Sequence, residues 1–318
     1  MEKLGEIKPL RLLFVGAGGV GAYYAARLIS SGNFVVLVAR GHHLEALQNH
    51  GLQVEHDQFS FKQPVRAVDD STMQTQYRCS DFDVLVLCMK SQDTAGWLDS
   101  KSVWMAEGAT PVLSLQNGVE NEAELSKVLG ISRIIGGLAV RIGAHIVSPG
   151  CIRAQGLGQI VLGPWPNTVA NRGLKTEVER LTGVFNASGI PTRTAADIRH
   201  ELWKKLMVNN GVNPLSALTR KDTGFLTKHP HYRQVVYAAM REVAAVSGAD
   251  DVVLSQSDVD EMFKLICEFD PIKTSMLVDL EKGRPLELDA ISGSVLRRAE
   301  RLGIDTPVTA LIQSMLSS

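Results

Sequence analysis

Long apolar runs, closely spaced cysteines and an excess of charge of either sign are all absent from this sequence. No run of about 18 apolar residues occurs, so a membrane span is not expected. The opening residues, MEKLGEIKPL, have neither the apolar core nor the small-residue cleavage site of a signal peptide. The formal net charge of −1 gives no indication of a nucleic-acid partner. These absences predict a cytoplasmic protein that binds neither membrane nor nucleic acid.

The cysteines are too scattered for a disulfide framework or a thiolate metal site. None forms a CxxC pair, and none of the histidines has the spacing of a ligand pair. Cys88 lies inside an apolar run that suits a buried thiol. We therefore expect no metal and a reduced compartment. The four cysteines are Cys79, Cys88, Cys151 and Cys267.

The first half of the chain alternates short β-rich runs with helical patterns. Several runs are apolar on consecutive residues, as in strands covered on both faces of a parallel sheet. Residues 52–68 alternate polar and apolar, which predicts a small inserted antiparallel hairpin, and residues 143–163 are also β-rich. The expected strands of the main sheet are 11–15, 34–39, 84–89, 111–115 and 134–140.

From Ala195 onward the pattern becomes helical, with few β-rich runs. The sequence therefore predicts an α/β fold: a Rossmann-type doubly wound domain over residues 1–194 and an all-helical domain over residues 195–318. Pro214 should end or kink the helix in which it lies. A ligand is expected in the cleft between two such domains.

A glycine-rich motif, GAGGVG, follows the first expected strand directly and opens a helix. Gly16 would permit a tight turn, Gly18 the approach of a pyrophosphate, and Gly21 close packing of helix on strand. The helix N-terminus would then present free N–H groups to the phosphates. Alone, the motif also fits a turn that binds no nucleotide. The candidate cofactor residues are Gly16, Ala17, Gly18, Gly19, Val20 and Gly21.

Three polar residues follow expected strands at the edge where doubly wound folds bind ligands. Arg40 stands where proteins that prefer NAD usually carry an acid, and its guanidinium suits a 2′-phosphate, which predicts NADPH. Lys90 ends the strand VLVLCM, and Asn117 follows PVLSL. A solvated arginine, a surface lysine and an ordinary Asn-Gly turn remain the alternatives.

The helical half carries a second polar group of residues. Lys205, Asn209 and Asn213 are spaced i, i+4 and i+8, so they share one helix face. One lysine and two amides suit a ligand with carbonyl and hydroxyl groups, although an exposed polar stripe is the alternative. Ser275 could begin a helix and bind a carboxylate. Glu287 follows a Gly-Arg-Pro turn and could equally be a surface acid.

Together these motifs resemble the ketopantoate reductase (2-dehydropantoate 2-reductase) family. The last two motifs below are specific, and all occur in order over about residues 10–310. They are GAGGVG at 16–21, Arg40, Lys90, LQNG at 115–118, W-x-K-x3-N-x3-N-P ending at Pro214, and S-M-x2-D-x3-G-R-x2-E-x-D ending at Asp289.

The resemblance implies NADPH-dependent reduction of 2-dehydropantoate to pantoate, a step of pantothenate biosynthesis, by hydride transfer to the 2-carbonyl. It implies that Lys205 is the general acid, since the family lysine lies two residues after the tryptophan. Glu287 would orient this lysine or accept a substrate hydroxyl. The other implied roles are cofactor binding by residues 16–21 with Arg40, Lys90 and Asn117, and substrate binding by Asn117, Asn209, Asn213 and Ser275.

Two positions depart from the family pattern: Ala154 replaces a histidine that many relatives have, and Ile272 replaces a polar residue near the substrate. The alternatives are therefore a reductase of another small 2-oxo acid and a non-catalytic NADPH-binding sensor. Other helical-domain dehydrogenases do not explain Ser275 together with Glu287. The oligomeric state is open, and a homodimer is the commonest assembly.

Overall fold

The computed structural model describes residues 8–167, 172–269 and 271–317, which form two compact units. The sheet unit runs to Gln116 and resumes over 121–198. The helical unit contains residues 117–120 and the chain from Arg199 onward. The predicted boundary lies between residues 194 and 195, whereas the compact units divide after Ile198 and exchange the short segment 117–120.

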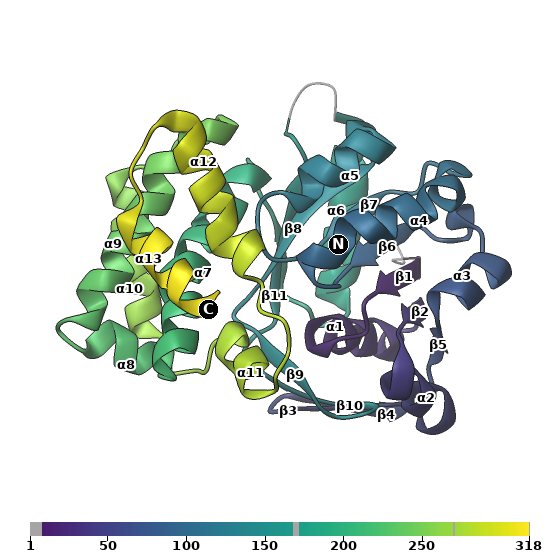
Figure 1. Ribbon diagram of the computed structural model, residues 1–318. Helices are drawn as coiled ribbons and strands as arrows, with labels where there is room; N and C mark the ends of the chain where they lie inside the picture. Colours follow the sequence, from purple (N-terminus) through teal and green to yellow (C-terminus); the bar gives the residue numbers. More distant parts are fainter. Residues whose placement is uncertain (1–7, 168–171, 270, 318) are drawn as a thin grey trace, which may run out of the picture. The chain divides into compact units, whose positions relative to one another are not determined.

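An eight-stranded sheet forms the centre of the sheet unit (Figure 1), in the order β12-β11-β8-β7-β6-β1-β2-β5. All neighbouring strands are parallel except β11, which pairs antiparallel with β8. Apart from the first residue of β1 and of β2, these central strands are buried along their length, as their Val and Leu runs predict. The strands are β1 (Arg11–Val15), β2 (Phe34–Val38), β5 (Arg66–Val68), β6 (Val84–Leu87), β7 (Val112–Ser114), β8 (Ile134–Val140), β11 (Gln159–Pro164) and β12 (Thr192–Thr194).

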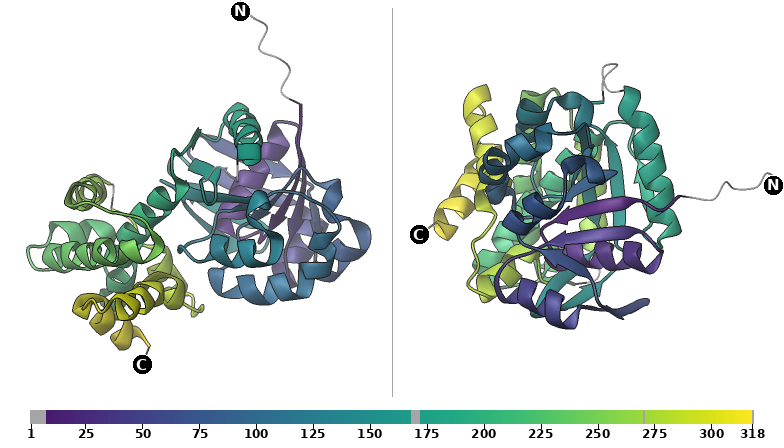
Figure 2. Two further views of the ribbon diagram at one scale, coloured as in Figure 1. Left: turned by 90° about the horizontal axis from the view of Figure 1, so that it is seen from above. Right: turned by 90° about the vertical axis from the view of Figure 1, so that its right-hand side faces the viewer.

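Helices pack on both faces of this sheet, as Figures 1 and 2 show, so it is doubly wound. Alternate strand residues divide the interior into two cores: Leu12 and Phe14 face one, while Leu13 and Val15 face the other. The first core is covered by α1 (Gly19–Ser30), α2 (Gly41–His50) and α6 (Arg172–Ala187). The second is covered by α3 (Asp70–Gln76), α4 (Thr94–Ala106) and α5 (Asn121–Leu129).

A second, four-stranded sheet in the order β4-β3-β10-β9 lies beside α1. Its strands are β3 (Leu52–His56), β4 (Phe59–Gln63), β9 (Gly143–Ser148) and β10 (Cys151–Gln155). The predicted hairpin exists as β3 and β4, but residues 66–68 join the main sheet instead. The pairing of β3 with β10 was not predicted, because it joins segments about 100 residues apart.

The second unit is helical, which confirms the predicted fold class. Its helices are α7 (Ile198–Thr219, which begins in the sheet unit), α8 (Thr223–Lys228), α9 (Tyr232–Val246), α10 (Gln256–Glu268), α11 (Ser275–Glu281), α12 (Ser294–Leu302) and α13 (Pro307–Leu316). Within the ranges that the structure describes, none of the helices combines the length with the apolar character of a membrane span.

The helix α7 does not end at Pro214, so of the two predicted outcomes, an end or a kink, the end is excluded. Proline removes one backbone hydrogen bond and costs about 3 kcal/mol in a helix interior. Val212, Leu215 and Ala217 are buried on either side of the proline. Burial of these apolar side chains offsets the cost, and the helix continues for another turn.

Candidate functional site

The glycine motif forms a tight loop between β1 and α1. The backbone N–H groups of Gly16 and Ala17 both donate to the carbonyl oxygen of Val38, at 3.2 and 3.1 Å. Gly16 has φ +102°, and a Cβ there would lie 2.6 Å from the backbone nitrogen of Met89. A Cβ at Gly21 would lie 2.3 Å from the carbonyl oxygen of Gly16. Both glycines are therefore required by the fold.

Gly18 differs from its neighbours because a Cβ there would meet no protein atom within 4 Å. Its φ of −70° and ψ of −171° are open to any residue, so neither backbone conformation nor packing requires glycine. Gly18 is also the N-cap of α1, where no side chain caps the helix and no acid lies in the first turn. An uncapped helix N-terminus beside open space fits a dinucleotide pyrophosphate.

Arg40 and Lys90 stand at the carboxyl ends of β2 and β6, as predicted. Arg40 is the N-cap of α2, and its side chain is 86% exposed. Its Nη2 donates to Oδ2 of Asp93 at 2.8 Å, a contact between residues 53 positions apart that no sequence motif indicates. Lys90 is half-buried and precedes a short 3-10 turn, Ser91–Asp93, that carries this acid.

His43 on α2 is a contact of the glycine loop that the sequence did not reveal. Its Nε2 lies 2.8 Å from the carbonyl oxygen of Ala17, and the backbone N–H of Gly150 donates to its Nδ1 at 3.1 Å. Because Nδ1 accepts, Nε2 carries the proton and donates to Ala17, so the imidazole is neutral. Burial lowers the pKa of His43, although the bond to Ala17 opposes this shift.

Acidification is expected to destabilise the sheet unit through His43. The unfolded imidazole titrates at about pH 6.5 and the folded one lower, so the unfolded state binds more protons between these two values. The free energy of unfolding should therefore fall as pH falls below about 6.5 toward the folded pKa. Denaturant unfolding at about pH 7.5 and about pH 5.5 measures this difference.

The His43→Gln variant should show a smaller pH dependence, because glutamine keeps a donor for Ala17 but does not titrate. His42→Gln is the matched control, since the His42 side chain is 91% exposed and pairs with Glu45. If the free energy of unfolding of His43→Gln depends on pH as that of the wild type does, His43 is not the source of the pH dependence.

In the helical unit the structure brings Asn117 and Glu287 together, 170 residues apart in sequence. Nδ2 of Asn117 donates to Oε2 of Glu287 at 3.0 Å. Glu287 is 8% exposed, so it is not the surface acid of the alternative interpretation. It lies two residues before a π-helical turn, Asp289–Gly293, a distortion that occurs frequently at functional sites.

Lys205, Asn209 and Asn213 all lie on α7, as their spacing predicted. Lys205 and Asn209 are half-buried and Asn213 is buried, so they do not form a fully exposed polar stripe. The neighbouring Asn210 links α7 to other parts of the helical unit instead. It accepts a hydrogen bond from Ser292 at 2.9 Å and donates one to Thr309 at 3.0 Å.

Ser275 begins α11, as predicted, and is exposed, while the hydroxyl of Thr274 caps the helix by accepting from the N–H of Leu277. Of the two departures from the family pattern, Ala154 is buried within β10 and Ile272 is exposed. No cluster of three or more His, Cys, Asp or Glu residues suited to a metal occurs in the described parts of the chain.

Comparison with known families decides the relationship. The family described as "Ketopantoate reductase PanE/ApbA" matches residues 12–167, and its C-terminal counterpart matches residues 197–318. The chain belongs to the ketopantoate reductase family. This confirms the resemblance found from the sequence motifs, and it makes the chain an oxidoreductase of the NAD(P)-dependent Rossmann class.

Individual members of the ketopantoate reductase family match over nearly their whole length. A 2-dehydropantoate 2-reductase of Nostoc sp. is 30% identical over 92% of this chain and 90% of its own. That of Archaeoglobus fulgidus is 30% identical over 96% of both chains. The crystal structure of 2-dehydropantoate 2-reductase from Geobacter metallireducens superposes with a TM-score of 0.85 at 30% identity, covering 97% of this chain and 99% of that one.

A D-mandelate dehydrogenase solved with NADH and anilino(oxo)acetate has the same fold. Its TM-score is 0.86 at 24% identity, with 97% of each chain covered. The fold of the ketopantoate reductase family is thus shared with an enzyme that was solved with NADH.

Proposed function

We propose that this protein reduces 2-dehydropantoate (ketopantoate) to pantoate with NADPH, a step of pantothenate biosynthesis. The observation that carries this proposal is the hydrogen bond from Asn117 to the buried carboxylate of Glu287. A carboxylate in such surroundings needs donors, and it can accept from an amide, an ammonium or a substrate hydroxyl. The pair therefore fits a hydroxyl-bearing 2-oxo acid.

The proposed chemistry divides between Lys205 and its neighbours. The nicotinamide supplies a hydride to the 2-carbonyl carbon when it is bound. Lys205 stabilises the developing alkoxide with its positive charge and donates the proton. Glu287 accepts a hydrogen bond from the Lys205 ammonium or from the substrate hydroxyl, while Ser275 binds the carboxylate. Asn209 and Asn213 hold the remaining polar groups of the substrate.

The proposed cofactor site is the glycine loop with the residues at the carboxyl ends of β2, β6 and β7. The open space above Gly18 accommodates the pyrophosphate. Arg40 binds the 2′-phosphate and exchanges its present partner, Asp93, for that group. Lys90 and Asn117 complete the site. A guanidinium at this position, in the absence of an acid after β2, supports NADPH over NADH.

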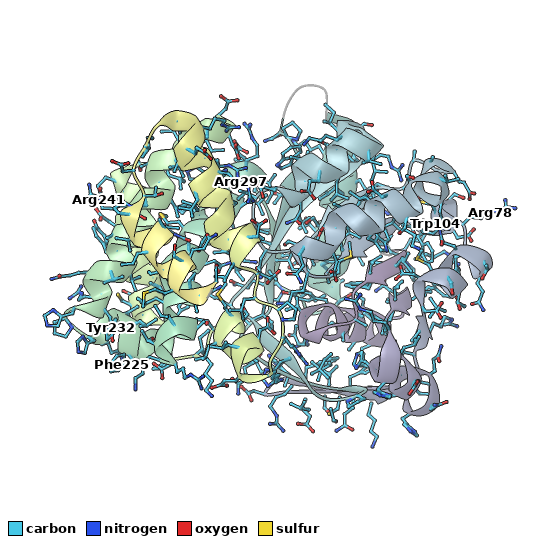
Figure 3. The ribbon with its side chains drawn as sticks, in the orientation of Figure 1. Arg78, Trp104, Phe225, Tyr232, Arg241 and Arg297 are labelled. Carbon is cyan, nitrogen blue, oxygen red and sulfur yellow. The ribbon has the colours of Figure 1, made fainter. Side chains whose placement is uncertain are left out.

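Removing the arginine tests this choice of cofactor. Arg40→Ala should lower the preference for NADPH over NADH in kcat/KM by on the order of 10-fold or more, because charge-assisted hydrogen bonds to the 2′-phosphate are lost. The matched control is Arg78→Ala, which removes an exposed arginine of the same unit (Figure 3). An unchanged preference in Arg40→Ala would place the 2′-phosphate elsewhere.

The substrate is tested by initial rates of NADPH oxidation with a panel of 2-oxo acids. Ketopantoate should be reduced with a higher kcat/KM than pyruvate, 2-oxoisovalerate or an aromatic 2-oxo acid. Faster reduction of another 2-oxo acid in the panel would still support a reductase, but with that acid as its substrate. Ile272, which is 44% exposed, would then be the first residue to replace with a polar one. Binding of NADPH without turnover of any member would favour the sensor.

A further inference from the structure

The segment 117–120 belongs to the helical unit, although both of its neighbours along the chain are fixed in the sheet unit. Nε2 of Gln116 donates to the hydroxyl of Thr94 at 2.7 Å and to the carbonyl oxygen of Met89 at 3.2 Å. The same hydroxyl donates to Oδ1 of Asn121 at 3.3 Å. Thr94 thus holds the two residues that flank the segment, whereas the segment itself is attached to the helical unit.

Glu120 provides that attachment, because two arginines of α12 bind its two carboxylate oxygens. Nη1 of Arg298 donates to Oε1 at 2.9 Å, and Nη2 of Arg297 donates to Oε2 at 2.6 Å. Figure 3 labels Arg297 on this helix. Isolated surface ion pairs contribute little to stability, but a carboxylate bound by two guanidiniums in a network resists rearrangement.

Arg298 is the more deeply placed of the two, with a side chain that is 10% exposed. Its Nε and Nη2 donate to Oδ2 of Asp250 at 2.8 and 2.6 Å, and its Nη1 also donates to the carbonyl oxygen of Ser294 at 3.0 Å. Its guanidinium carbon lies 5.4 Å from the ring centroid of Trp203. Trp203 precedes Lys205 by two residues on α7, so the network reaches the helix of the proposed acid.

Arg297 connects the same segment to the chain around Glu287. Its Nη1 donates to Oδ1 of Asp289 at 2.6 Å, two residues beyond the glutamate. A Cβ at Gly118 would lie 3.1 Å from the carbonyl oxygen of Ala290, so the segment passes close to the π-helical turn. The residues that follow Asn117 and those that follow Glu287 are thus held together, directly at Gly118 and through Arg297 at Glu120.

We propose that Glu120, Arg297 and Arg298 are positioning residues, which fix segment 117–120 so that Asn117 meets Glu287. In this role they act through Asn117 and not by direct contact with substrate or cofactor. The inference deepens the proposed function, on which its kinetic part rests. It adds a determinant of substrate affinity that lies outside the residues named by the family motifs.

Hydrogen exchange of the protein without ligands tests the positioning directly. Glu120→Gln keeps the size of the side chain but turns an NH2 group toward an arginine donor. Exchange at the amides of residues 118–120 should accelerate by on the order of 10-fold or more, because bonds to a charged group are lost. Glu177→Gln is the matched control, since it removes the acid of another Glu–Arg pair, with Arg180, on the sheet unit. If Glu120→Gln does not fold, Arg297→Gln removes one of the two bonds from a half-exposed residue.

Kinetics then separate positioning from a general loss of stability. Glu120→Gln should raise KM for the 2-oxo acid more than it lowers kcat, and this effect should vanish in an Asn117→Ala background. Unchanged exchange at 118–120 overturns the proposal, and so does an effect on KM that persists undiminished without Asn117. If the wild type reduces no 2-oxo acid, the proposed function fails, while the exchange result still decides whether Glu120 fixes the segment.

Discussion

Replacing Lys205 with alanine is expected to lower kcat for the 2-oxo acid by on the order of 10²–10⁴-fold while leaving cofactor affinity almost unchanged. The reason is that the alkoxide formed from the carbonyl needs both a positive charge and a proton, whereas a water molecule in place of the lysine carries no charge and is a weaker acid. Steady-state rates together with the cofactor Kd, measured by fluorescence titration, separate the chemical step from cofactor binding.

The adjacent lysine provides the control for this experiment. Nζ of Lys204 lies 2.8 Å from Oε2 of Glu261 and 3.6 Å from Oδ1 of Asp258. Its charge is therefore paired with two acids of α10. Lys204→Ala should therefore leave kcat within a few-fold of the wild type. Equal losses in both variants would show that the effect belongs to the helix, and a fully active Lys205→Ala would eliminate the lysine as the acid.

The second large effect is expected in the glycine loop between β1 and α1, where substitution of Gly18 should change cofactor binding and substitution of Gly16 should change stability. Gly18→Ala should weaken cofactor binding by on the order of 10–100-fold, because its methyl group would occupy the space proposed for the pyrophosphate. It should leave the stability of the cofactor-free protein nearly unchanged, since that methyl group would contact no protein atom within 4 Å.

Gly16→Ala should do the reverse and destabilise the cofactor-free protein by about 2–5 kcal/mol. Its φ of +102° is unfavourable for alanine, and the added carbon would lie 2.6 Å from the backbone of Met89. Denaturant unfolding without cofactor and cofactor titration at low temperature measure the two effects separately. A Gly18→Ala protein that is unstable, or that binds NADPH normally, would contradict the proposed place of the pyrophosphate.

The main sheet could be predicted because its strands are short, apolar and covered on both faces. The expected strands at 11–15 and 134–140 agree with β1 and β8 at both ends. The second sheet could not be predicted, because β3 pairs with β10 across about 100 residues and alternation alone does not identify a partner. Helix α7 continues past Pro214 because burial of the residues around the proline outweighs the tendency of proline to end a helix.

The candidate site was predictable where the spacing of residues reflects one element. Lys205, Asn209 and Asn213 lie on one helix, as their i, i+4 and i+8 positions indicated. The contacts of Glu120 with Arg297 and Arg298 were not, because charged residues in a helical pattern resemble a solvated face. Only the fold shows that these charges meet, and the same holds for His43 and the glycine loop.

The most direct test of the central claim is the identity of the acid formed from ketopantoate and NADPH that carries deuterium at C4 of the nicotinamide. We predict that mass spectrometry will find pantoate with one deuterium at C2 from one of the two C4 epimers, in an amount equal to the NADPH consumed. Loss of NADPH without pantoate, or pantoate that carries no deuterium from either epimer, would contradict the account.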